Sequence, residues 1–322
     1  MLCSIGKTIK PEDLGEIPAN VTAIAEGAFE GSNIQAVVIP ASVKTIGDRA
    51  FADVESLEHV VFAGADNSTS SLASIGKQAF ANTGLLTIAL PEGVQTIGDE
   101  VFSGSMVASV TLPSSLKTIP KGMFKDSAVA SVILGANTQV IEARAFSGCE
   151  DLAYIGLGVA SGSTSALPSS VTSIGDGAFE NCGLAALELG DGLLSIGAAA
   201  FSGCNIAELV VPDTVTDLGQ HAFSGMGKLR KITVGAGAPV SAYVEAFADD
   251  RALKRIDASP ACTQVVSSDG VLFSADMTQL IAYPLGVYGA YQMPDSVASI
   301  APGAFASAAT TNVVFPEALR VI

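Results

Sequence analysis

A phenylalanine that recurs along the whole chain restricts the possible folds of these 322 residues more than any other feature. Successive members are mostly 22 residues apart, with a few wider gaps. A fixed period of this size indicates a repeat architecture, in which similar units stack along one axis. The column consists of Phe29, Phe51, Phe80, Phe102, Phe124, Phe146, Phe179, Phe201, Phe223, Phe247 and Phe305.

Other columns keep the same phase as the phenylalanine. An alanine usually precedes it, at a point where adjacent coils would press backbone against backbone. A proline stands eleven residues before it in seven repeats and follows a β-branched run such as Val37-Val38-Ile39. Because proline has no amide proton for a ladder, it predicts the end of a strand. An aliphatic residue stands five positions before nearly every phenylalanine: Ile24, Ile46, Ile75, Ile97, Ile119, Ile141, Ile174, Ile196, Leu218 and Ile300.

The second half of each unit has apolar residues at helical spacing. Ile46, Ala50, Phe51 and Val54 are an example, and they would cover about two turns. The sequence therefore predicts a strand, a turn and a short helix in each coil. One such unit cannot bury its apolar face alone, so residues 1–322 are expected to form a single α/β solenoid of about a dozen coils.

The combined motif resembles the BspA-type, or Treponema-type, leucine-rich repeat. It consists of a strand, Pro, Val, Ile-Gly, Ala-Phe, and a small residue or Cys three positions later. The segment from Ser268 to Pro284, with turns expected at Asp269-Gly270 and at 274–276, resembles the β-hairpin cassette of that family. The resemblance implies a right-handed superhelix. It also implies a bacterial surface or secreted protein that attaches to host proteins, extracellular matrix or other bacteria.

Three insertions interrupt the period, at 64–71, 158–166 and 259–290, and each branches off directly after a predicted strand. They should therefore share one rim of the solenoid. Such loops can build a binding surface, or they can simply be tolerated because the rim is exposed. The last repeat is incomplete at residue 322, so we expect a fragment of a longer protein. Residues 1–10 lack the pattern of a secretory signal peptide.

Charge and hydropathy restrict the partners. The formal net charge of −16 disfavours nucleic acid and anionic lipid, whose recognition needs clusters of Lys and Arg that we expect to be absent. The longest uncharged stretch, 152–175, contains many Ser, Thr and Gly residues and keeps the repeat phase. No insertion of this segment into a membrane is expected.

The residues give no indication of catalysis, a metal site or a cofactor. The two histidines, His59 and His221, cannot supply a triad, because His221 stands in a repeat column. No Cys-x-x-Cys pair or histidine cluster suggests zinc. Cys149, Cys182 and Cys204 each stand three residues after a repeat phenylalanine, so we expect reduced, buried thiols that fill the core.

The remaining candidate site is the concave face of the sheet, where alternation points every second side chain outward. In the first half these side chains are mostly small: Ala36, Val38, Thr87, Ala89, Ser109, Thr111 and Ser131. From Tyr154 onward they form a strip of mixed charge, the kind of surface that can select a protein partner. The predicted strip comprises Tyr154, Glu188, Glu208, Lys231, Arg255 and Asp257. A charged face that only keeps the sheet soluble is the alternative.

These observations favour a non-enzymatic recognition or adhesion module that binds a protein or glycoprotein through the strip and the inserted rim. By family resemblance it belongs to a microbial cell-surface or secreted protein. Two alternatives remain open. One is an intracellular scaffold, which unpaired cysteines would suit. The other is an accessory binding domain of a larger enzyme.

Overall fold

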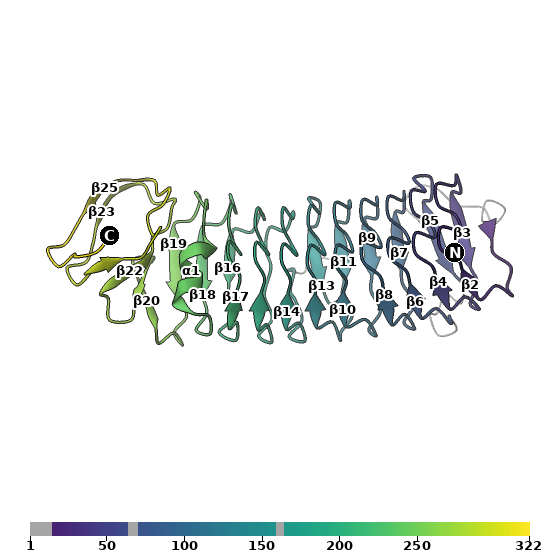
Figure 1. Cartoon of the computed structure of the whole chain (residues 1–322), viewed down its shortest axis with the longest axis horizontal. Helices are drawn as coiled ribbons and strands as arrows, with labels where there is room; N and C mark the ends of the chain where they lie inside the picture. Colours follow the sequence, from purple (N-terminus) through teal and green to yellow (C-terminus); the bar gives the residue numbers. More distant parts are fainter. Residues whose placement is uncertain (1–14, 64–69, 159–163) are drawn as a thin grey trace.

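The computed structural model describes residues 15–63, 70–158 and 164–322. They form a long rod, with the strands near residue 15 at one end and residue 322 at the other (Figure 1). About 13 coils of roughly 22 residues follow one another along the rod and pair through short parallel strands. The predicted solenoid is confirmed. Most of the first two predicted insertions, at 64–71 and 158–166, lies outside the described residues.

One ladder of parallel strands runs along one side of the rod, and we call its outer surface the strand face. Its strands pair in parallel, in the orders β1-β3-β5, β7-β9-β11-β13 and β16-β18-β19. Every second residue points into the core, as Val110 and Val132 do. The strands are β1 (Gly15–Glu16), β3 (Ala36–Ile39), β5 (His59–Phe62), β7 (Thr87–Ala89), β9 (Ser109–Thr111), β11 (Ser131–Ile133), β13 (Tyr154–Gly156), β16 (Glu208–Val210), β18 (Lys231–Val234) and β19 (Arg255–Ala258).

A second ladder, which the sequence analysis did not expect, contains the isoleucine column. Its strands have two residues each, and they also pair in parallel. The second residue of each is the column isoleucine or leucine, and most of these side chains are buried. The strands are β2 (Ala23–Ile24), β4 (Thr45–Ile46), β6 (Ser74–Ile75), β8 (Thr96–Ile97), β10 (Thr118–Ile119), β12 (Val140–Ile141), β14 (Ser173–Ile174), β15 (Ser195–Ile196), β17 (Asp217–Leu218) and β24 (Ser299–Ile300).

The prediction of a short helix in each coil is wrong. Among the described residues the single α-helix is α1 (Val240–Ala246), and the other coils have successive turns in that place. In the coil of Phe51, Arg49 and Asp53 adopt left-handed backbone angles, with φ of 53° and 59°. An α-helix cannot continue through such residues. The Phe51 amide instead donates to the carbonyl of Ala79 in the next coil, at 2.8 Å. The turns therefore alternate hydrogen bonds within the coil, such as Ala52 to Arg49 at 3.0 Å, with hydrogen bonds to the next coil.

The core is a continuous stack of phenylalanine rings. From Phe29 to Phe247 each ring stacks on the next, with centroids 5.0–6.1 Å apart. The alanine that precedes the ring is fully buried in most coils. The structure thus buries all the phenylalanines assigned to the core: Phe51, Phe102, Phe146, Phe179, Phe201 and Phe223.

Cys149, Cys182 and Cys204 lie in the same core, and the four described cysteines are free thiols. The thiols of Cys149 and Cys204 donate to the carbonyl oxygens of Phe124 and Phe179, at 2.9 and 2.8 Å. Burial raises the pKa of the Cys149 and Cys204 thiols to about 12. They are therefore uncharged core groups at neutral pH.

The predicted hairpin cassette is confirmed and contains one further strand. β20 (Val265–Ser268), β21 (Val271–Ser274) and β22 (Gln279–Ala282) are antiparallel, and β22 then pairs with β24 in parallel. Beyond the cassette, β23 (Gly289–Gln292) pairs with β25 (Thr310–Val314). The cassette separates two cores, because Leu272 and Ile281 pack into the long core and Phe273 and Leu280 into a smaller one.

The smaller core contains an aromatic residue that the column analysis missed. The ring of Tyr283 stacks on that of Phe305, with centroids 4.6 Å apart. Its amide donates to the carbonyl of Ala304 at 3.1 Å, which is the contact that column phenylalanines make with the next coil. Tyr283 stands 22 residues before Phe305 and therefore fills the aromatic position of its coil.

Candidate functional site

The structure brings four of the six predicted strip residues together on the strand face. Glu208, Lys231 and Arg255 form one row across β16, β18 and β19, because the strands pair in that register. Val210, Thr233 and Asp257 form the next row. Glu208 and Arg255 are exposed, and Lys231 and Asp257 are partly exposed. We call these two rows the charged strip.

Asp257 links the cations of the strip. Its carboxylate lies 2.8 Å from Nε of Arg255 and 3.4 Å from Nζ of Lys231. Burial raises the pKa of Asp257, but the hydrogen bonds and charges of Arg255 and Lys231 outweigh it, so that its pKa lies below the ordinary value. The carboxylate is therefore ionised at neutral pH, and it holds both cations in a fixed arrangement.

A cleft of about 470 Å³ adjoins the strip where the third insertion begins. Strand β20 closes one side of it, because the hydroxyl of Ser267 donates to the carbonyl of Ile256 on β19 at 2.7 Å. The cleft contains both charged and apolar groups, and Val266 in its wall and Val210 in the strip are exposed. Its lining includes Thr233, Arg255, Asp257, Pro260, Cys262 and Val266.

The other two predicted strip residues lie differently. Tyr154 keeps the expected outward position, in register with Ser131, but its side chain is buried and so is not available on the surface. Its ring lies over Gly156, where no side chain competes for the space, and its hydroxyl donates to the carbonyl of Leu157 at 3.1 Å. Glu188 is exposed. Ala185 and Ala207 occupy equivalent positions, because the amide of Ala207 donates to the carbonyl of Ala185, and Glu188 and Val210 each stand three residues later. Glu188 therefore belongs to the second row. Ala36, in the half with small residues, is buried as well.

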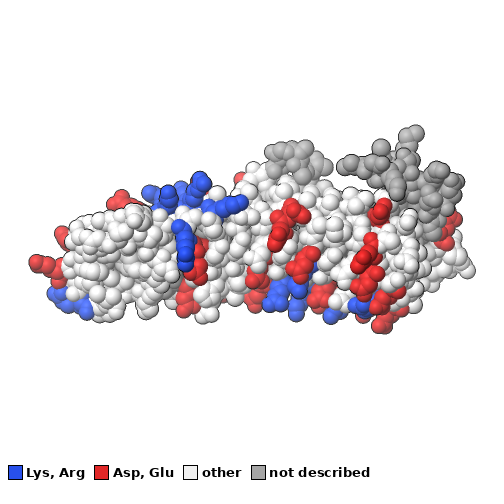
Figure 2. Space-filling model, turned by 90° about the horizontal axis from the view of Figure 1, so that it is seen from above, with Lys and Arg blue, Asp and Glu red and all other residues white. Residues whose placement is uncertain are grey.

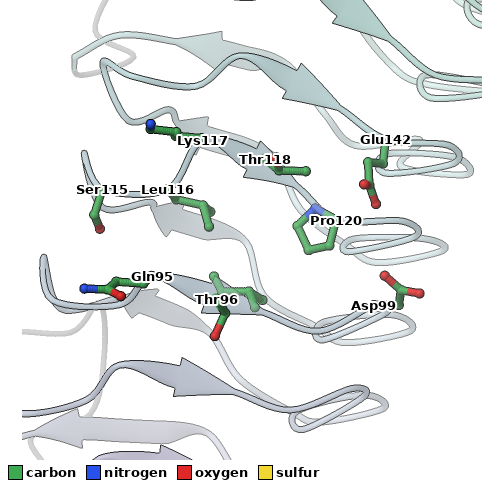
Figure 3. Close-up of a pocket in the computed structure, with 10 residues that line it drawn as sticks. Gln95, Thr96, Asp99, Ser115, Leu116, Lys117, Thr118, Pro120 and Glu142 are labelled. Atoms are coloured by element: carbon green, nitrogen blue, oxygen red, sulfur yellow. The ribbon is translucent and has the colours of Figure 1, made fainter.

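A second cleft, of about 510 Å³, lies on the ladder of two-residue strands (Figure 3). The carboxylates of Asp99 and Glu142 lie on either side of Pro120, and Lys117 is at the opposite end (Figure 3). Pro120 and Glu142 occupy the column that is glycine in most coils, and this break in the Ile-Gly pattern is the sequence signal that was overlooked. Glu142 is already engaged, because it accepts the amide hydrogen of Lys121 at 3.0 Å.

The expected absence of Lys and Arg clusters is wrong for one part of the chain. Six of its 16 Lys and Arg residues lie within 228–255, whereas 145–227 contains none. Figure 2 shows basic side chains gathered along one edge of the rod near β18 and β19. The six are Lys228, Arg230, Lys231, Arg251, Lys254 and Arg255.

The family model described as "BspA type Leucine rich repeat region" matches in six copies, over residues 14–73, 66–164 and 159–268. The chain belongs to the BspA-type leucine-rich repeat family. The matched part includes the whole charged strip and ends where the hairpin of the cassette begins.

A solved structure with a similar fold supports the architecture of this BspA-type chain. The chain is similar to a leucine-rich repeat protein from Bacteroides ovatus, with a TM-score of 0.69 and 23% identity over 96% of this chain and 74% of that one. The pneumococcal vaccine antigen PcpA gives a TM-score of 0.49 and 18% identity over 96% and 78% of the two chains. A leucine-rich cell surface protein from Faecalibacterium prausnitzii gives 0.40 and 21% over 96% and 69%. None of the curated proteins is detectably similar to the chain.

No catalytic domain is identified in this BspA-type chain. His59 on β5 is partly buried and has Glu58 at 3.9 Å, and His221 is exposed on a turn. Within residues 15–63, 70–158 and 164–322, no group of three or more His, Cys, Asp and Glu side chains is placed to hold a metal ion. In the same ranges no helix has the length and hydropathy needed to cross a bilayer.

Proposed function

We propose that this chain is a non-enzymatic module that binds a protein or glycoprotein partner through the charged strip and the adjoining cleft. The observation that carries the proposal is the two rows in register across β16, β18 and β19. They present Glu208, Lys231 and Arg255 beside the exposed Val210 on a rigid ladder. Protein interfaces combine apolar anchors with charges that select the partner, and this surface offers both.

The rigidity of the strip supports the same role. Its three strands pair in one parallel ladder with β18 in the middle, and Asp257 holds two of its cations. Preorganised side chains lose little conformational entropy when a partner binds. In the first half of the solenoid, the equivalent row of Thr87, Ser109 and Ser131 has no charge and offers a partner little to recognise.

Membership of the BspA-type family supports a place on the microbial cell surface or in the secreted fraction, and a role in adhesion. A second candidate is an intracellular scaffold, which the free cysteines favour. Protease treatment of intact cells that make the full-length protein separates the two. Release of repeat peptides from the cells supports the surface location, whereas retention of all repeat peptides supports the scaffold.

The binding surface is tested with purified extracellular matrix glycoproteins immobilised on a sensor. We expect at least one to bind the chain, and Glu208→Ala, Lys231→Ala and Arg255→Ala together to weaken that binding at least tenfold. The matched control is Thr87→Ala, Ser109→Ala and Ser131→Ala, in the same row of the other half, which should bind like the parent. Failure of every glycoprotein to bind, or equal loss in both variants, would overturn the proposal.

A further inference from the structure

The basic cluster at 228–255 contains two kinds of cation. Lys231 and Arg255 belong to the charged strip and share Asp257. The other four, Lys228, Arg230, Arg251 and Lys254, are all exposed. In the described part of the chain, none of these four is within 4.0 Å of a carboxylate. We call these four residues the rim patch, because they lie just before the strands of their coils.

The rim patch stacks like charges on neighbouring coils. The amide of Lys254 donates to the carbonyl of Arg230 at 2.9 Å, so the two residues occupy equivalent positions one coil apart. Adjacent strands are about 4.8 Å apart, and like charges at that separation repel each other. In the coils before them the same position is Ala108, Ala130, Ala153 and Ala207. Where these coils have alanine, Arg230 and Lys254 instead place two positive charges on neighbouring coils. The charges repel each other in the free protein, and an anion bound between them would reduce that repulsion.

We propose that the rim patch binds the sulfate or carboxylate groups of an anionic polysaccharide. The paired ammonium and guanidinium groups provide charge-assisted hydrogen bonds to such groups. An acidic sugar polymer separates its charges by neutral rings with hydroxyl groups. Such a polymer can therefore place its anions on the two coils of the patch, while its uncharged rings pass over the acidic side chains of the neighbouring coils.

The surroundings of the patch favour this ligand over other polyanions. Among the side chains between 227 and 256 whose exposure is described, no large hydrophobic one is exposed, so this segment lacks the anchors typical of protein and lipid-surface binding. The preceding coils contain Glu208, Asp213 and Asp217 and no cation back to residue 145. They would repel the continuous row of phosphates in a nucleic acid.

The test uses heparin as the sulfated probe and hyaluronan as the carboxylated one, both immobilised, with neutral dextran as the blank. We expect the parent chain to bind at least one of the two acidic polymers. Lys228→Gln, Arg230→Gln, Arg251→Gln and Lys254→Gln together should weaken that binding at least tenfold. The matched control changes four lysines on other coils to Gln, which alters net charge equally: Lys77, Lys117, Lys121 and Lys125.

The control should bind within about twofold of the parent, and only the rim variant should show a reduced dependence of affinity on salt. Equal losses in the two variants would mean that net charge alone is responsible and would overturn the proposal. So would tighter binding to polyglutamate, to DNA or to phosphatidylserine vesicles. Thermal unfolding of each variant verifies that the fold is kept. Because the rim patch shares no residue with the three substitutions in the strip, failure here leaves the protein-binding proposal untouched.

Discussion

The coils up to Phe223 and the part of the chain from Val240 onward use the same repeat in different ways. In the first part each ring stacks between two others, and one core runs through every coil. In the second part the stack ends at Phe247, directly after α1, and beyond the β-hairpin a separate core forms around Tyr283 and Phe305. Regular coils therefore give length and rigidity, whereas the irregular part adds a helix, a β-hairpin and a second core.

The candidate binding surfaces follow this difference. The charged strip, its cleft and the rim patch all lie between β16 and the cassette, where the regular part ends. A regular coil must match its neighbours on both sides, which restricts its side chains to small or apolar groups at most contacts. Where insertions relieve that restriction, charged residues can collect on the outside.

The largest expected effect comes from breaking the ring stack in the regular part. Phe201 is fully buried between the rings of Phe179 and Phe223. Phe201→Ala should lower the free energy of unfolding by about 3–5 kcal/mol. Phe305 is only partly buried, so Phe305→Ala should cost less, about 1–3 kcal/mol. Urea unfolding followed by circular dichroism measures both, and equal costs would remove the distinction between the two regions.

Asp250 offers a pH-dependent test at the boundary between the regions. It is fully buried in the column that is Ser, Thr or Cys in most coils, and its Oδ2 has no partner among the described residues. Burial raises its pKa to about 8, although Oδ1 accepts the Met226 amide hydrogen at 2.7 Å. Below about pH 4 the carboxyl is protonated in both folded and unfolded chains. Between about pH 4 and 8 it is ionised only when unfolded, so this group makes the free energy of unfolding decrease as pH rises.

Asp250→Ser should remove that decrease and raise the free energy of unfolding at pH 8 by about 1–3 kcal/mol, because at that pH folding must either protonate the carboxyl or bury its charge. At pH 4 the gain should disappear. Urea unfolding of parent and variant between pH 4 and 8 measures the difference between their free energies of unfolding. The contributions of the other titrating groups cancel in this difference. Asp250→Asn, which keeps the shape without the charge, should also lose the slope. If the free energy of unfolding still decreased with pH in both variants as in the parent, Asp250 would not be the group responsible.

The parts of the fold that depend on burial could be predicted from the sequence, and those that depend on backbone conformation could not. The columns of Phe51 and Ile46 repeat because each coil buries the same positions. Helical spacing around Phe51 was misleading, because apolar periodicity says nothing about φ at Arg49 and Asp53. A usable signal was present, since the position two residues after most column phenylalanines is Gly, Asn or Asp, the residues that best tolerate left-handed angles.

The site was predictable to a similar extent. Alternation along the strands placed Glu208, Lys231 and Arg255 in one row, because the period of two fixes the direction of a side chain in a paired strand. It also gave the row of Tyr154 but not its burial, because the long ring folds over the neighbouring Gly156. The rim patch was missed because net charge was considered for the whole chain rather than coil by coil.

The smallest expected effect tests whether the charged strip is free to serve binding. Arg255 and Lys231 are more than one-third exposed, so solvent screens their ion pairs with Asp257. Asp257→Asn should therefore lower the free energy of unfolding by less than about 1 kcal/mol. Because the folded pKa of Asp257 is lowered, this contribution is present above its ordinary pKa near 3.8 and is lost as pH falls.

Urea unfolding at pH 7 and pH 3, in low and high salt, measures the effect. Asp126→Asn, which breaks the exposed pair with Lys125 at 3.4 Å on a regular coil, is the matched control and should have no measurable effect. A cost of several kcal/mol for Asp257→Asn alone would show that the strip holds the coils together. Its charges would then be explained by stability, and the comparison of a regular scaffold with an irregular binding region would lose its main support.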